Sequence, residues 1–215
     1  MKVSIIIPTL DGDRDGLMQY AVASAKNQTG FTLGKDYEII IQIADECVSK
    51  NINDAVKKAK GDYIKLLGDD DLMMPNCLID LYTKIIEGFD FVCANAINFE
   101  PNGNEDIVCS EIPETVSDLA IENTLHGGTI LYRRATFLPF DERMWTAEEY
   151  DHSMRMAAAG LRFGYTDRVV YRYRLHGTQK SEFYWQSSQD KKQGRYAYIM
   201  SIQDRYYNNH SKICR

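Results

Sequence analysis

Apolar and polar positions group along the chain into blocks that predict strands and helices in turn. Continuous aliphatic runs at residues 3–7, 37–43 and 63–67 predict strands that are buried on both faces. Helical spacing of apolar positions within residues 16–28 and 52–60 predicts helices between these strands. Because strands that alternate with helices form βαβ units, this half of the chain indicates a parallel sheet.

The pattern becomes mixed in the second half of the chain. Pro75 in the first turn and Gly88 past the end bound a predicted helix over 75–86, and a strand over 89–99 follows. The remaining predicted elements are a hairpin strand at 105–111, strands at 128–133 and 169–175, a helix at 147–159 and a helical tail within 178–215. The expected fold class is α/β, with a mixed, mainly parallel sheet flanked by helices and a C-terminal helical tail.

The composition is that of an ordinary globular domain and narrows the function classes only slightly. The chain has 215 residues, 44% of them hydrophobic and 26% charged, which is enough to bury a substantial core. A net charge of −6 argues against a nucleic-acid-binding role, and no apolar run approaches the ~18–20 residues that cross a bilayer. Five scattered cysteines without a CxxC pair argue against a zinc or disulfide framework, so we expect a reducing, cytoplasmic location.

Three consecutive carboxylates, Asp69 to Asp71, follow the predicted strand at 63–67. Like charges at this spacing repel one another, and the carboxyl edge of a parallel sheet is where ligands bind. A hard divalent cation such as Mg²⁺ or Mn²⁺, which itself holds phosphates, would offset the repulsion. The alternative is a solvated acidic turn that caps the next helix through its dipole, and spacing alone leaves both interpretations open.

The segment around these carboxylates resembles the centre of family 2 glycosyltransferases. Residues 53–75 read NDAVKKAKGDYIKLLGDDDLMMP, with the Asn, short helix, strand, acidic motif and Pro of that family in order. Residues 3–9 resemble its first strand and nucleotide loop, 24–40 its first helix and second strand, and 147–176 its ED-x-D…R…YRxH region.

The resemblance covers residues 1–181 and implies the GT-A (Rossmann-like) fold, with inversion at the anomeric carbon. It implies a nucleotide-sugar half at 1–100, an acceptor and catalytic half at 101–181, and a tail at 182–215. The implied reaction moves a sugar from a nucleotide-diphosphate donor, UDP-linked by default, to a hydroxyl of a glycan or glycoconjugate in polysaccharide biosynthesis. The chain is short for this family, so it is also compatible with a domain of a larger polypeptide.

The resemblance also implies which residues form the site. Mn²⁺ or Mg²⁺ would be held by Asp70, Asp71 and His176. The implied donor contacts are Pro8, Thr9, Asp11, Asp45, Asn53, Asp69 and Asp70. Two departures leave the donor base open: Asp45 stands in IADEC where the family usually has Asp-Asp-Gly-Ser, and Gly68 stands where the acidic motif often begins with Asp.

The general base is expected on the helix at 147–159. Glu149 occupies the second position of the family's ED pair, and Glu148 and Asp151 are the alternatives. The competing interpretation of the two glutamates is a helix N-terminus that is stabilised by its dipole. Residues 126–129 read HGGT and resemble the stretch that lines the acceptor side, where glycines let a backbone approach a sugar; an ordinary turn explains them equally.

Other function classes remain as alternatives. Residues 11–16 imitate the start of an EF-hand loop, but its twelfth position is Val22 rather than the required Glu, so we exclude an EF-hand. The same acidic segment weakly imitates an Asp-based phosphatase nucleophile, and it lacks the basic character of a sugar-nucleotide pyrophosphorylase loop. A non-catalytic GT-A module that binds nucleotide sugar or carbohydrate is the third alternative, because Glu149 replaces the family's Asp.

Overall fold

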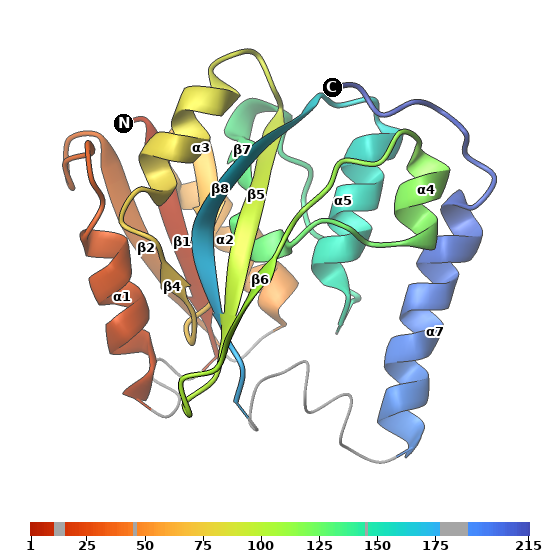
Figure 1. Cartoon of the computed structure of the whole chain (residues 1–215), viewed down its shortest axis with the longest axis horizontal. Helices are drawn as coiled ribbons and strands as arrows, with labels where there is room; N and C mark the ends of the chain where they lie inside the picture. Colours follow the sequence, from red (N-terminus) through yellow and green to blue (C-terminus); the bar gives the residue numbers. More distant parts are fainter. Residues whose placement is uncertain (11–15, 45–46, 145, 177–188) are drawn as a thin grey trace.

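The protein is described by a computed structural model that covers residues 1–10, 16–44, 47–144, 146–176 and 189–215, with the backbone alone at 189–196. Within these residues, eight strands form one sheet in the order β2-β1-β3-β7-β5-β8-β4, and β6 pairs with β5 (Figure 1). The strands are β1 Val3–Thr9, β2 Tyr37–Ile43, β3 Tyr63–Leu66, β4 Leu72–Met73, β5 Phe91–Phe99, β6 Glu105–Val108, β7 Leu131–Arg133 and β8 Phe163–Arg174.

Helices cover both faces of this sheet and give three layers. On one face lie α1 (Met18–Lys26) and α3 (Cys77–Ile85), which pack buried residues such as Ala21 and Leu78 against the strands. On the other face lie α2 (Val48–Lys58), α4 (Val116–Ile121), α5 (Glu148–Ala158) and α7 (Gln189–Tyr206) (Figure 1). Each face therefore has its own apolar core.

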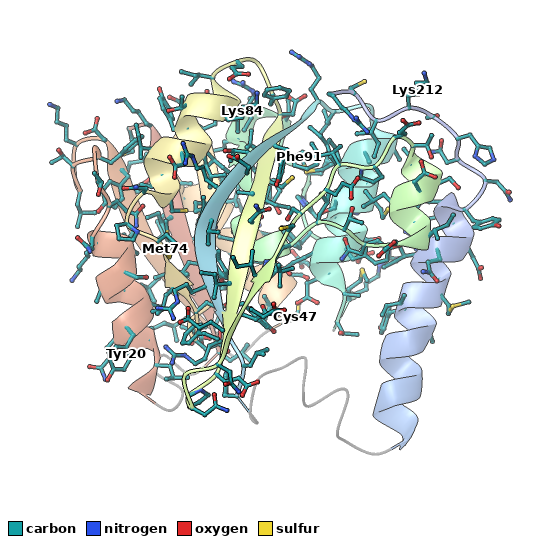
Figure 2. The ribbon with its side chains drawn as sticks, viewed as in Figure 1. Tyr20, Cys47, Met74, Lys84, Phe91 and Lys212 are labelled. Carbon is teal, nitrogen blue, oxygen red and sulfur yellow. The ribbon has the colours of Figure 1, made fainter. Side chains whose placement is uncertain are left out.

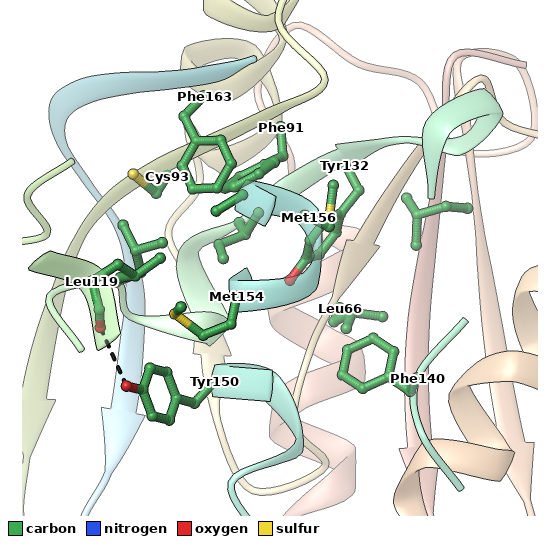
Figure 3. Close-up of a cluster of buried hydrophobic side chains, with 14 of the residues drawn as sticks. Leu66, Phe91, Cys93, Leu119, Tyr132, Phe140, Tyr150, Met154, Met156 and Phe163 are labelled. Atoms are coloured by element: carbon green, nitrogen blue, oxygen red, sulfur yellow. Dashed lines mark hydrogen bonds between the residues drawn. The ribbon is translucent and has the colours of Figure 1, made fainter. Parts of the chain in front are cut away.

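The larger core joins the strands to α4 and α5. Phe91 of β5 packs on Phe163 of β8, with ring centroids 3.5 Å apart, and both side chains are fully buried (Figure 3). The Tyr150 hydroxyl donates to the carbonyl of Ala120, at 2.7 Å, so this tyrosine contributes apolar area without leaving its hydroxyl unpaired. Burial of each such large side chain stabilises the fold by about 1.5–3 kcal/mol, and it anchors α5 against the sheet.

The strand directions bring the chemistry-bearing segments to one edge of the sheet. Strands β1, β2 and β3 are parallel, so the segments that follow Thr9, Ile43 and Leu66 leave at the same edge, which is the lower one in Figure 1. Strands β5 and β8 run in the same direction, whereas β7 is antiparallel and begins at this edge. The acidic turn at 68–71, the turn at 127–129 and the end of β8 are therefore neighbours.

The predicted fold class is confirmed, and the differences from the expected elements have local causes. Helix α4 was missed, although Thr115 and Asp118 form a capping box in which each side chain accepts from the other's backbone N–H. Strand β7 is shorter than expected because residues Gly127–Thr129 form a 3-10 turn. Strand β8 begins at Phe163, ahead of the predicted 169, because a bulge against β5 places the polar residues 166–168 within the strand.

The helical tail is confirmed over α7, and the division into halves at residue 100 stays a prediction. In the part of the chain that the structure describes, no helix is both long and apolar enough to cross a membrane.

Candidate active site

The acidic turn that follows β3 is built around Asp71, whose side chain points into the protein. The residue is 4% exposed, and its carboxylate accepts two hydrogen bonds, from the Tyr171 hydroxyl at 2.7 Å and from the Arg174 backbone N–H at 2.8 Å. The Gly68 N–H donates to the same tyrosine oxygen at 3.0 Å. A Cβ atom at position 68 would lie 2.6 Å from Oδ2 of Asp71, so glycine is required where the resembling family often has Asp.

Burial raises the pKa of Asp71 well above its ordinary value, and the neighbouring Asp70 carboxylate raises it further. The hydrogen bonds from Arg174 and Tyr171 act in the opposite direction. Both oxygens of Asp71 are therefore committed to protein donors, and the residue holds the turn in shape.

Asp70 and His176 come together beside this turn, with 17% and 11% of their side chains exposed. The His176 Nε2 atom lies 3.1 Å from Oδ2 of Asp70, and the Arg174 guanidinium donates to the Asp70 carbonyl at 2.8 Å. Two of the three predicted metal ligands thus meet, whereas Asp71 is turned inward. Among the described residues, no group of three His, Cys, Asp or Glu side chains is arranged to hold a metal ion.

This donor pair fits a divalent cation that is shared with a substrate. Mg²⁺ is usually bound by one or two carboxylates together with substrate phosphates and waters, and Mn²⁺ accepts both oxygen and imidazole donors. Asp70 supplies a carboxylate and His176 an imidazole, so a diphosphate would have to complete the ligand set.

Glu149 lies at the same edge of the sheet, on the first turn of α5 and beside the 127–129 turn. Ala147, the N-cap residue of α5, has φ 58° and ψ 20°, a left-handed conformation that costs energy for a residue with a side chain. A Cβ atom at Gly127 would lie 2.5 Å from Oε2 of Glu149, so this carboxylate rests directly on the 127–129 turn. The Glu149 side chain is exposed and Glu148 is half-buried, so Glu149 is the more accessible of the two.

Asp151, the third predicted alternative for the base, is in a different environment. Its side chain is 2% exposed and forms ion pairs with Arg155 at 2.6 Å and with Arg205 at 3.3 Å. The pair with Arg205 ties α5 to α7, and Asp151 is the least accessible of the three carboxylates.

The predicted donor contacts divide into two groups. Pro8 and Thr9 lie at the carboxyl end of β1, where Asn51 donates to the Thr9 carbonyl at 3.3 Å and to the Ala44 carbonyl at 3.1 Å. Asn53 faces elsewhere: it donates to the Phe140 carbonyl at 2.9 Å and accepts from the Phe140 N–H at 2.8 Å.

The other donor contacts are placed only in part. Asp69 is half-buried within the acidic turn. Asp11 and Asp45 lie outside the described residues.

Sequence reasoning missed two residues at this edge. Asn51 joins the ends of β1 and β2, and helical periodicity alone does not say whether position 51 or 53 faces the sheet. Lys65 lies inside β3 with 0% exposure, and the only available signal was a single charge within an apolar run.

Comparisons with known proteins identify the family of the chain. The sequence profile described as Glycosyl transferase family 2 matches residues 6–160. No curated protein sequence matches the chain.

Several solved structures share its fold. The crystal structure of S. aureus TarS 1–349 in complex with UDP-GlcNAc has a TM-score of 0.66 and 16% identity, over 94% of this chain and 66% of that one. The complex of TarS 1–349 with UDP has a TM-score of 0.60 and 16% identity, over 97% and 71%. The longer TarS structure has a TM-score of 0.61 and 16% identity, and this chain spans 44% of its length. At this identity the likeness concerns the fold.

Proposed function

The chain belongs to glycosyl transferase family 2, and from this premise we propose that it transfers a sugar from a nucleotide-diphosphate donor to an acceptor hydroxyl, with inversion at the anomeric carbon. One observation carries the proposal: Asp70 with His176, and the accessible Glu149, lie on two separate segments at the same edge of the sheet. Inversion requires the leaving group and the attacking oxygen to occupy opposite faces of the sugar, and this edge offers a group for each.

The leaving-group side is formed by the acidic turn. When a divalent cation is bound, it supplies charge neutralisation for the departing diphosphate. Asp70 and His176 would hold that cation, as Mn²⁺ or Mg²⁺, while Asp71 keeps the turn rigid through Tyr171 and Arg174. The proposed donor is a UDP-sugar, because UDP and UDP-GlcNAc are the ligands named for the similar TarS structures.

The attacking side is formed by Glu149. Its carboxylate takes the proton of the acceptor hydroxyl while the acceptor oxygen bonds to the anomeric carbon. The bond between that carbon and the diphosphate oxygen breaks, and the electron pair leaves with the diphosphate. Gly127 lets the Glu149 side chain rest directly on the backbone of the turn, and a glycan or glycoconjugate is the proposed acceptor.

The experiment is a thermal-unfolding screen followed by an assay of donor cleavage. We expect one nucleotide sugar of a UDP, dTDP and GDP panel to raise the melting temperature in the presence of Mn²⁺, since a ligand at a hundred times its Kd stabilises a fold by about 2.7 kcal/mol. Asp70→Asn should abolish this rise, and Asp54→Asn, which changes a carboxylate on α2 that is paired with Lys50 and Lys57, should preserve it.

Three outcomes separate the candidates. Stabilisation together with release of nucleoside diphosphate supports the transferase. Stabilisation with no release, for any acceptor tested, supports a non-catalytic nucleotide-sugar-binding module. Absence of both, together with hydrolysis of a generic phosphoester, would favour the phosphatase alternative and overturn the proposal.

A further inference from the structure

Lys65 is a fully buried cation in the middle of the sheet, directly beneath the edge that carries the site. Lysine is almost never fully buried unless its charge is paired, because desolvation of an ammonium is costly. Its Nζ atom donates to the carbonyl of Leu66 at 2.7 Å and to the carbonyl of Gly128 at 2.5 Å. It also lies 4.9 Å from the ring centroid of Tyr171, within cation–π distance.

These three contacts reach both sides of the proposed site. On the leaving-group side, the Tyr171 hydroxyl donates to Asp71 and accepts from the Gly68 N–H. On the attacking side, Gly128 belongs to the turn on which Glu149 rests. Lys65 therefore contacts Tyr171, which binds the acidic turn through Asp71. It also contacts the 127–129 turn, which supports Glu149.

The 127–129 turn and β8 are in direct contact beside Lys65. A Cβ atom at Gly128 would lie 2.5 Å from Cε1 of Tyr171, so the backbone of the turn rests directly on the tyrosine ring. The ammonium, the ring and the turn thus form one packed unit built from β3, β8 and the 127–129 segment. A unit of this kind transmits a displacement of one part to the others, because packed interiors are not freely deformable.

Titratable groups on several elements surround Lys65. Burial lowers the pKa of Lys65, and electrostatic interactions with Cys77, Glu149 and Asp71 raise it. These groups come from α3, α5 and the acidic turn; His126, before Gly127, and Tyr171, on β8, also interact with Lys65.

We infer that Lys65 is a positioning residue, which sets the acidic turn and the Glu149-bearing turn at the separation needed for inverting transfer. This inference rests on the proposed function. Lys65 is screened from substrate by its burial, so it acts through Tyr171 and Gly128 rather than on the reacting atoms.

Kinetics of Lys65→Met and Lys65→Gln test the inference, with Lys84→Met as the matched control. Lys84 lies in the last turn of α3, toward the opposite edge of the molecule, and pairs with Glu87 (Figure 2). We expect Lys65→Met to lower kcat about 100-fold, because a displacement of ~1 Å costs roughly that factor, with the donor KM changed less than about threefold. Lys65→Gln, which keeps N–H donors for the two carbonyls, should recover part of kcat.

The pH profile supplies a readout that a purely structural role would not move. Lys65 contributes positive charge near Glu149, so both variants should shift the acid limb of kcat to higher pH, whereas Lys84→Met should not. Unchanged kcat and an unchanged acid limb in Lys65→Met would overturn the inference.

Hydrogen exchange tests the same coupling without turnover. In Lys65→Met, or in Lys65→Gln if the first variant does not fold, amides at 68–71 and 127–129 should lose protection together, while α3 keeps its protection. Loss in only one of the two segments, or in neither, would count against the inference. A wild-type protein that binds and cleaves no donor would refute the proposed function. Hydrogen exchange would still show whether Lys65 couples the two turns.

Discussion

Three carboxylates stand on the first turn of α5, and their surroundings give them different chemistry. Glu149 is exposed above Gly127, Glu148 is half-buried, and Asp151 is buried in ion pairs with two arginines. A base must reach the acceptor proton, so access decides between them before intrinsic basicity does. Sequence spacing places all three on one helix turn and does not show which of them packs against a neighbouring helix.

Glu149→Gln should therefore lower kcat by about 10²–10⁴-fold, the range that a general base contributes, and leave donor affinity within about threefold of wild type. Glu148→Gln, with the same change in charge and shape one residue away, should retain more than about a tenth of wild-type kcat. Initial rates at saturating donor and a donor titration by calorimetry check both. Wild-type turnover in Glu149→Gln would assign the base elsewhere.

At the scale of elements, α2 anchors the segment that leads into α5. Asn53 joins α2 to the backbone of Phe140, and its amide also donates to Glu142 at 3.0 Å. The Cys47 thiol, at the start of α2 (Figure 2), donates to the Glu142 carbonyl at 3.3 Å. The chain then reaches the strained Ala147 and enters α5, so these bonds hold the approach to Glu149.

Asn53→Ala should destabilise the protein by about 2–4 kcal/mol, because it leaves the buried N–H and carbonyl of Phe140 without partners. We expect kcat to fall as α5 loosens, while donor affinity changes little, since the amide faces Phe140. Asn104→Ala, in an exposed turn, is the control and should change neither quantity. Urea unfolding and donor titration measure the two effects. A large loss of donor affinity with unchanged stability would restore Asn53 to the nucleotide site.

The elements themselves follow from the sequence where one physical signal dominates. Strands β1, β2 and β3 are apolar runs, and α3 lies between Pro75 and Gly88. The contact between Asp70 and His176 was predicted by the ordered family motifs, whereas residue spacing alone does not predict it. Contacts between distant segments could not be predicted from the sequence. The hydrogen bond from Lys65 to Gly128 depends on β3 lying beside β7, and no local pattern specifies that pairing.

At the scale of the whole molecule, the fold holds one buried and one half-buried histidine, His152 and His126, that stay uncharged. His152 is fully buried in the larger core, where its ring stacks on Phe140 at 4.1 Å and Nε2 lies 2.7 Å from the Leu138 carbonyl. Burial lowers the pKa of His152 to about 3 and that of His126 to about 4. Both histidines are thus neutral in the folded protein across the physiological range.

Stability should therefore fall on acidification before the carboxylates titrate. Below about pH 6.5 the unfolded chain binds protons at His152 and His126 that the folded protein does not, so acid favours unfolding until the folded pKa values of about 3 and about 4 are reached. Each histidine adds a slope of about 1.4 kcal/mol per pH unit between roughly pH 5.5 and 4.5.

His152→Gln, whose amide can still donate to the Leu138 carbonyl, should lower the free energy of unfolding at pH 7 and flatten this slope by about one proton. His210→Gln changes an exposed histidine outside the cores and should leave the slope as in wild type. Urea unfolding of wild type and the two variants at half-unit intervals from pH 7.5 to 4.5 measures the slope of the free energy of unfolding against pH. Parallel curves for wild type and His152→Gln would mean that His152 is protonated inside the core, at odds with its stack on Phe140 and its burial.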